Sequence, residues 1–226
     1  MSLNKCDTEY RIEKLLKKYA LSYTFTIACR ESALSQRELV EILVEKTNDA
    51  YAVAETLTQG LFSDLLYESV DLLVKHGVSA DEIVKMLNSY MLYTEKQASI
   101  LVRAGANPDT VIDIITEVTL HRSIEFFVDA GASPEKLLEK ISYIDASNGK
   151  FIIECLKRAR VDMNKLVDKI EEMSLLDWHK ELVNAGADVE HIKRRIRKLL
   201  KGKNFPVAVV GKKYRRAINE LCKKAI

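Results

Sequence analysis

Apolar residues in the middle of the chain recur with helical spacing and are interrupted by a repeated short junction. The clearest copy is Val128–Glu135, which reads VDAGASPE. A glycine after a periodic apolar run is typical of a helix end, because glycine adopts a left-handed backbone without steric cost. Ser133 is an N-cap type of residue, and Pro134 suits the first position of a helix. The junction therefore predicts the end of one helix and the start of the next.

The junction recurs at Val74–Asp81, Val102–Asp109 and Val183–Glu190. Apolar residues also follow each junction glycine by six and ten positions. This register recovers three degenerate copies, in which Arg160, Thr47 or Ala20 stands in the glycine position, although the apolar pattern breaks after Ala20. The glycine positions are then 20, 47, 77, 105, 131, 160 and 186, so the units are 26–30 residues long. Such a period predicts a repeated helix–turn–helix architecture.

The pattern predicts helices of about 10–13 residues, alternating with short turns between residues 63 and 201. Earlier helices are expected at 8–19, 22–31, 35–45 and 49–58. Within 22–31 the alternation at Tyr23–Ile27 also fits a strand, but the register favours a helix. Ser35 with Glu38, and Ser79 with Glu82, have capping-box spacing. An irregular connection is expected over 201–213, followed by a last helix at about 214–224.

The segment Ser123–Ala132, SIEFFVDAGA, resembles the second helix and exit turn of an ankyrin repeat. The resemblance covers about half of each unit between residues 67 and 190. The Thr-Pro-Leu-His opening of the first ankyrin helix is absent, and the units are shorter than the ~33 residues of ankyrin, which leaves no length for a β-hairpin finger. The resemblance implies an all-α solenoid of about seven stacked helix–turn–helix repeats that serves as a protein-interaction scaffold.

We therefore expect a single domain over residues 1–226. It would comprise divergent N-terminal repeats (1–60), regular repeats (61–190) and a basic C-terminal cap (191–226). The composition is 47% apolar and 30% charged, which is ordinary for a folded soluble protein. The polar start and the lack of an apolar run near 20 residues predict a cytoplasmic protein without a signal peptide or membrane contact. Four widely separated cysteines predict free thiols in a reducing compartment.

No motif predicts an enzyme. The segment Val207–Lys212 is similar to a strand leading into a phosphate loop, but Pro206 and Lys213 replace the glycine and the Ser or Thr that this motif needs. None of the four histidines has zinc-ligand spacing. A catalytic Cys/His pair that meets only in space stays open. We expect a non-enzymatic protein with no cofactor and no metal.

Charge is distributed very unevenly along the chain. Residues 191–226 carry thirteen Lys and Arg side chains against the single acid Glu220, a net charge of +12, so residues 1–190 carry −10 of the total of +2. On the helix opening at Glu190 we expect Lys193, Arg197 and Lys201 to form one solvent-facing stripe, with Arg194 and Lys198 beside it. The candidate residues for binding phosphate or an acidic partner are Lys193, Arg194, Arg197, Lys198, Lys201, Lys203, Lys212, Lys213, Arg215 and Arg216.

Three interpretations of this basic end stay open. It is a solubilising cap on the last repeat, a site for phosphates or an acidic surface, or a surface for head-to-tail self-association with the acidic body. Phe205 and Tyr214 do not make a stacking platform, which disfavours sequence-specific nucleic-acid recognition. The main hypothesis is a protein-binding scaffold. The alternative is a nucleic-acid-binding protein that makes sequence-independent phosphate contacts.

Overall fold

The protein is all-α. The computed structural model describes residues 3–58, 63–87, 94–144, 147–201 and 216–217, and these contain fourteen helices and no strand. The expected all-α class is thereby confirmed, and the ambiguous segment 22–31 is helical. None of the described helices is long and apolar enough to cross a membrane. The chain divides into two compact units, residues 1–115 and 116–226.

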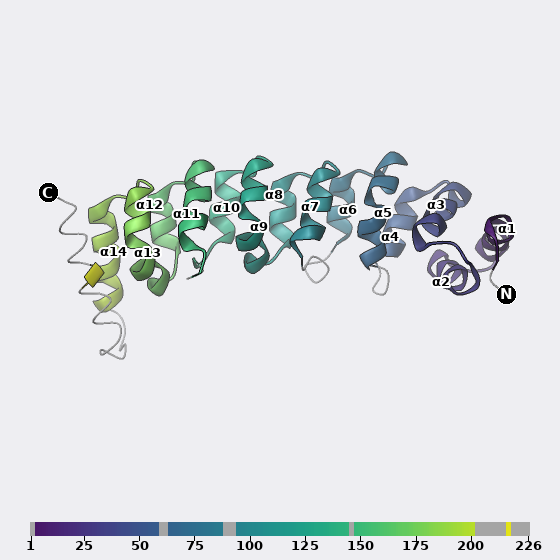
Figure 1. Cartoon of the computed structure of the whole chain (residues 1–226), viewed down its shortest axis with the longest axis horizontal. Coiled ribbons are helices and arrows are strands. Elements are labelled where there is room, and N and C mark those ends of the chain that lie inside the picture. Colours follow the sequence, from purple (N-terminus) through teal and green to yellow (C-terminus); the bar gives the residue numbers. More distant parts are fainter. Residues whose placement is uncertain (1–2, 59–62, 88–93, 145–146, 202–215, 218–226) are drawn as a thin grey trace. The chain divides into compact units, whose positions relative to one another are not determined.

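The first unit contains eight helices, which form two rows (Figure 1). They are α1 (Lys5–Leu16), α2 (Leu21–Glu31), α3 (Gln36–Thr47), α4 (Ala50–Leu57), α5 (Ser63–Lys75), α6 (Ala80–Met86), α7 (Glu95–Arg103) and α8 (Pro108–Ile114). The odd-numbered helices α1, α3, α5 and α7 pack in succession, and so do the even-numbered α2, α4, α6 and α8. Each helix therefore packs against the corresponding helix of the next pair.

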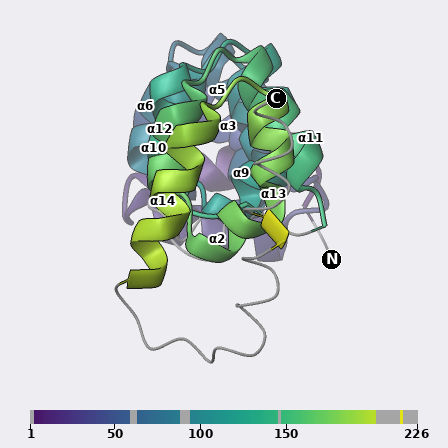
Figure 2. The same cartoon turned by 90° about the vertical axis from the view of Figure 1, so that its left-hand side faces the viewer.

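The described residues of the second unit form six helices, and Figure 2 views the structure from the end where α14 lies. They are α9 (Glu117–Asp129), α10 (Pro134–Lys140), α11 (Gly149–Arg158), α12 (Met163–Lys169), α13 (Glu172–Asn184) and α14 (Val189–Lys201). Here α11 packs between α9 and α13, while α14 packs against α12 and α13. The alternate-helix packing of the first unit thus recurs in the second.

The predicted junctions are present in both units. Gly77, Gly105, Gly131 and Gly186 all have positive φ, between 84° and 111°. Arg160, expected in the glycine position of a degenerate copy, also adopts the left-handed region with φ of 63°. Both predicted capping boxes form, and both junction prolines occupy the first turn of a helix. The backbone therefore repeats where the sequence repeats, even where glycine is lost.

The apolar register is buried throughout. The residues six and ten positions after each junction are at most 5% exposed. They are Val53, Leu57, Ile83, Leu87, Val111, Ile115, Leu137, Ile141, Leu166, Ile170, Ile192 and Ile196. Burying a side chain of this size contributes about 1.5–3 kcal/mol relative to leaving it in water. This register is the core of each helix pair.

The predicted helix lengths are wrong for one class of helix. α6, α8, α10 and α12 have seven residues each, because each ends at the tenth residue after the junction. That residue, such as Leu87 or Ile115, takes an extended backbone at the C-cap. Its side chain nevertheless stays buried. The short helices therefore end at a residue whose side chain remains part of the core.

Three details of the N-terminal helices also need correction. The left-handed residue after α3 is Asn48, with φ of 52°, one position after the expected Thr47. Ala20 has an extended backbone and is the N-cap residue of α2, so it is not a helix-ending position. The first helix begins at Lys5 instead of residue 8, because the Asn4 side chain accepts a hydrogen bond from the N–H of Asp7. The segment 202–215 and most of the expected last helix lie outside the described residues.

Hydrogen bonds join successive pairs at equivalent positions. The N–H of Asn107 donates to the Asp81 carboxylate at 2.8 Å, and the N–H of Asp188 donates to the Asn164 side chain at 2.8 Å. In each case the second residue of a short helix accepts from the N-cap residue of the next pair. Among the described cysteines, Cys6, Cys29 and Cys155 are free thiols, and burial raises the pKa of the last two.

The left-handed positions generate a matched pair of stability predictions. A Cβ added at Gly131 would meet no atom within 4 Å, so Gly131→Ala tests the backbone conformation alone. We expect it to lower the free energy of unfolding by about 1 kcal/mol, and Arg160→Gly to raise it by about 0.5–1 kcal/mol. Urea denaturation of both variants measures this. A stabilising Gly131→Ala, or a destabilising Arg160→Gly, would contradict the assignment.

A second prediction concerns Gly149, which lies against the indole of Trp178. A Cβ at Gly149 would overlap with Cε2 of that ring, so Gly149→Ala must displace it. We expect a loss of roughly 1–3 kcal/mol from overpacking. Because Trp178 is the only tryptophan, its fluorescence reports the displacement. In a Trp178→Leu background, denaturation followed by circular dichroism should show a smaller cost, and an equal cost in both backgrounds would exclude the contact as its cause.

Candidate functional site

The helix α14 departs from the short helices that occupy the same place in earlier helix pairs. It has thirteen residues where α6, α8, α10 and α12 have seven. Ile196 corresponds to the residue that ends each short helix, yet it lies in the interior of α14, buried like its counterparts. The helix therefore continues for five further residues, and this extension carries Arg197, Lys198 and Lys201.

The structure separates the predicted basic residues of α14 into buried and exposed ones. Arg194, Arg197 and Lys198 are exposed, as expected. Lys193 is not part of a solvent-facing stripe: it is only 5% exposed, and its Nζ lies 2.6 Å from Oε1 of Glu190. Its long apolar stem can be buried while the ammonium reaches the carboxylate one turn earlier. The expectation of a stripe through Lys193 is therefore wrong.

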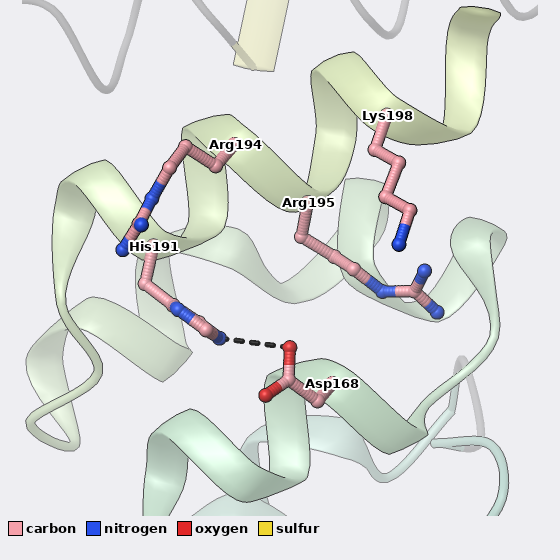
Figure 3. A pocket seen from close by; sticks show the side chains of 5 residues that line it. All are labelled: Asp168, His191, Arg194, Arg195 and Lys198. Carbon is pink, nitrogen blue, oxygen red and sulfur yellow. Dashed lines mark hydrogen bonds and ion pairs between the residues drawn. The ribbon is translucent and has the colours of Figure 1, made fainter.

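A hollow of about 380 Å³ lies between α12 and α14. Its lining residues are Asp168, His191, Arg194, Arg195 and Lys198 (Figure 3). His191 Nε2 lies 2.9 Å from Oδ1 of Asp168, which joins the two helices across the hollow. Among the described lining residues, three cationic side chains of α14 thus share a concave surface with a single carboxylate.

Four cations of α14 lack, among the described residues, the ion pairs that long basic side chains make elsewhere. Arg37 bonds to Asp71, 2.6 Å apart, and this hydrogen bond lowers the pKa of that carboxyl group. Arg158 pairs with both Glu125 and Asp129. By contrast, no carboxylate among the described residues pairs with any of the following: Arg194, Arg195, Arg197 and Lys198. Their charges are available to an external anion.

Spacing along α14 makes this cluster unfavourable for the isolated protein. Arg194 and Lys198 are four residues apart, and Arg195 and Lys198 are three apart, so like charges occupy neighbouring turns. Such pairs destabilise a helix by about 0.2–0.5 kcal/mol each. The helix dipole favours cations in the last turn, but this does not explain arginines in the middle of the helix. The arrangement favours contact with an anion.

Only part of the predicted set meets at this hollow. Arg194 and Lys198 line it, Arg197 is exposed outside its lining, and Arg216 lines a separate hollow of about 320 Å³ beside Trp178. Lys201 ends α14, and nothing is described of its side chain. The remaining candidates, Lys203, Lys212, Lys213 and Arg215, lie outside the described residues. In the part of the chain described, no group of three or more His, Cys, Asp or Glu side chains is placed to hold a metal ion.

Sequence reasoning missed three of the five lining residues: Asp168, His191 and Arg195. Arg195 was counted in the charge total but was not assigned to a face. Asp168 lies 23 residues before His191 and belongs to the preceding pair. The repeat spacing contained a usable signal for the contact between Asp168 and His191. Other hydrogen bonds between successive helix pairs join residues that are 26 and 24 positions apart.

Comparisons with known proteins do not assign this chain to a family. No family model and no curated protein matches the sequence, and no solved structure matches the fold.

The buried position of Lys193 generates a prediction that separates it from the binding residues. Lys193→Met keeps an apolar stem and removes the ammonium group. Because the Glu190 side chain is exposed, the substitution leaves no buried charge without a partner, and we expect the free energy of unfolding to change by less than about 1 kcal/mol. Lys193→Ala should lower it by about 1–3 kcal/mol through loss of buried methylene groups. Urea denaturation of both variants measures these changes. A severe loss of stability in Lys193→Met would show instead that the pair with Glu190 is structurally essential.

Proposed function

We propose that this protein is a non-enzymatic interaction module, a scaffold that binds an acidic partner macromolecule through α14. The observation that carries the proposal is the set of exposed cations on this helix, Arg194, Arg197 and Lys198, which no described carboxylate neutralises. Electrostatic attraction of this kind steers association and selects partners of opposite charge.

The scaffold that we propose is ankyrin-like, with helix pairs stacked within each unit and no hairpin finger. Support comes from the recurring left-handed junctions, the buried register and the packing of alternate helices. In such repeats each pair buries its apolar face only against its neighbours. Residues on the outside of a pair are then free to serve binding.

A solubilising cap accounts less well for α14 than a binding surface does. Solubility is served by mixed charges, and like charges at neighbouring turns cost helix stability. The repeats upstream carry mixed charges that pair, as with Lys136 and Glu139 in α10. The helix α14 carries a run of cations, and the described residues of α12 contribute only Asp168 to the adjoining hollow.

Nucleic acid is the second candidate partner, and the hollow between α12 and α14 favours it. Cationic groups that converge on one concave surface suit a phosphate, whereas a flat acidic protein surface would need only the exposed side chains. Contacts of this kind fix a strand without reading its bases.

The test compares two triple variants of the full chain that change charge equally. One variant replaces three residues of α14 by Glu: Arg194, Arg197 and Lys198. The control replaces three exposed lysines of the first unit by Glu: Lys18, Lys46 and Lys96. Binding to an acidic peptide, single-stranded RNA and double-stranded DNA is titrated at about 50 and 200 mM salt, where phosphate contacts weaken sharply. We expect the α14 variant to lose at least about tenfold in affinity for one class, and the control less than about threefold.

Each result of this comparison has a definite meaning. Loss of acidic-peptide binding alone supports the scaffold, and loss of nucleic-acid binding alone supports the second candidate. If both triple variants weaken binding equally, the attraction is a property of net charge and α14 is not the docking element. Absence of binding to all three probes at low salt overturns both proposals. Sedimentation of the free protein at the same salts tests the head-to-tail self-association.

A further inference from the structure

We propose that the hollow between α12 and α14 holds one phosphate group of a nucleic-acid backbone, with Arg195 and Lys198 as its principal donors. This inference rests on the proposed role of α14 in docking and specifies the chemistry of the ligand there. It adds Arg195, His191 and Asp168, none of which was among the residues expected to bind.

Arg195 carries the strongest indication of a missing acceptor. Its Nε is buried and has no hydrogen-bond partner among the described residues. A buried donor left without an acceptor costs about 1–3 kcal/mol. Figure 3 shows Arg195 and Lys198 extending together from α14 toward α12, with Arg194 on the His191 side. An anion in this hollow would compensate the charge of Arg195, whose guanidinium group makes no ion pair among the described residues, and would relieve the repulsion between the three cations.

The number of donors favours phosphate over carboxylate. One guanidinium group satisfies a carboxylate through two parallel hydrogen bonds. Here two guanidinium groups and an ammonium group line the same hollow, which suits the additional oxygens and charge of a phosphate. The described lining residues include no aromatic side chain on which a base could stack. We therefore expect the phosphate to be held and the base to be ignored.

The exposed Arg197 favours a strand over an isolated phosphate. It lies on α14 outside the lining of the hollow and has no described ion-pair partner. A free phosphate would use the hollow alone, whereas a strand presents further phosphates to residues beside it. Arg197 therefore serves as a second contact for a neighbouring phosphate of the same strand.

Asp168 opposes the anion and so sets the affinity of the hollow. Among the described lining residues it is the single carboxylate, and its Oδ1 is bonded to Nε2 of His191. The imidazole stands between the carboxylate and Arg194 in Figure 3 and directs the carboxylate toward itself. Removing the charge of Asp168 should strengthen anion binding, an effect that loss of a structural residue would not produce.

The first experiment uses inorganic phosphate as the probe. The ring signals of His191 are followed by NMR while phosphate is added to the full chain, with chloride at matched ionic strength as the reference. We expect a saturable shift, weakened at least about tenfold by Arg195→Gln because it removes a charged hydrogen bond. Asp168→Asn should tighten binding about two- to fivefold. Arg197→Gln, which removes an equal charge outside the hollow, should change it by less than about twofold.

The second experiment titrates a short single-stranded oligonucleotide against the same variants. Both Arg195→Gln and Arg197→Gln should weaken its binding, and inorganic phosphate should compete with it at matched ionic strength. Phosphate that binds without competing would overturn the assignment to a nucleic-acid strand and leave a small phosphate ligand. An acetate titration that matches phosphate in affinity would overturn the preference for phosphate.

Failure of this inference is distinguishable from failure of the proposed function. If phosphate shifts His191 no more than chloride does, while the α14 triple variant still abolishes polyanion binding, the hollow is not a site but α14 remains the docking element. If Arg197→Gln weakens phosphate as much as Arg195→Gln, the attraction is spread over the helix and the hollow has no special role. Unchanged circular dichroism of each variant excludes misfolding as the cause.

Discussion

Burial of one apolar side chain, ten residues after each left-handed junction, determines the geometry of the short helices. At Leu87, Ile115, Ile141 and Ile170 the backbone leaves the helical conformation while the side chain is retained in the core. A seven-residue helix has too few internal hydrogen bonds to be stable alone. These helices therefore exist because both of their ends are fixed: by capping side chains at the start and by the buried residue at the end.

Helix α14 departs from this geometry. Ile196 is buried as its counterparts are, but the backbone there remains helical and α14 continues to Lys201. Extension by more than a turn places Arg197 and Lys198 beyond the point where an earlier helix would have ended. The basic surface is therefore a consequence of a missing helix stop combined with a local change in composition. The change in composition alone would have left a short basic helix. The missing helix stop alone would have left a long helix of mixed charge.

The sequence predicted the backbone well wherever a single residue type controls a local conformation. The four glycines, the capping serines and the junction prolines act within a few residues, and the register identified Arg160 although it is not a glycine. Helix length was predicted poorly, because Leu87 or Ile115 looks like one more apolar position of a helix. Whether such a residue continues the helix or ends it is decided by the neighbouring pair, which periodicity along one segment does not contain.

The candidate site was predictable in its charge but not in its shape. A count of bases located α14, whereas helical periodicity assigned Lys193 to solvent although it reaches Glu190 from a buried position. The hollow depends on Asp168 and His191, which belong to different pairs and meet only through packing.

Packing also explains why cations can remain without partners on this helix. Helix α6 lies between α4 and α8, so its charged residues face neighbours on both sides. Among the described helices, α14 has a neighbour in its own row only on the side of α12. On that side Asp168 already bonds to His191, so the arginines of α14 retain their full charge for a ligand.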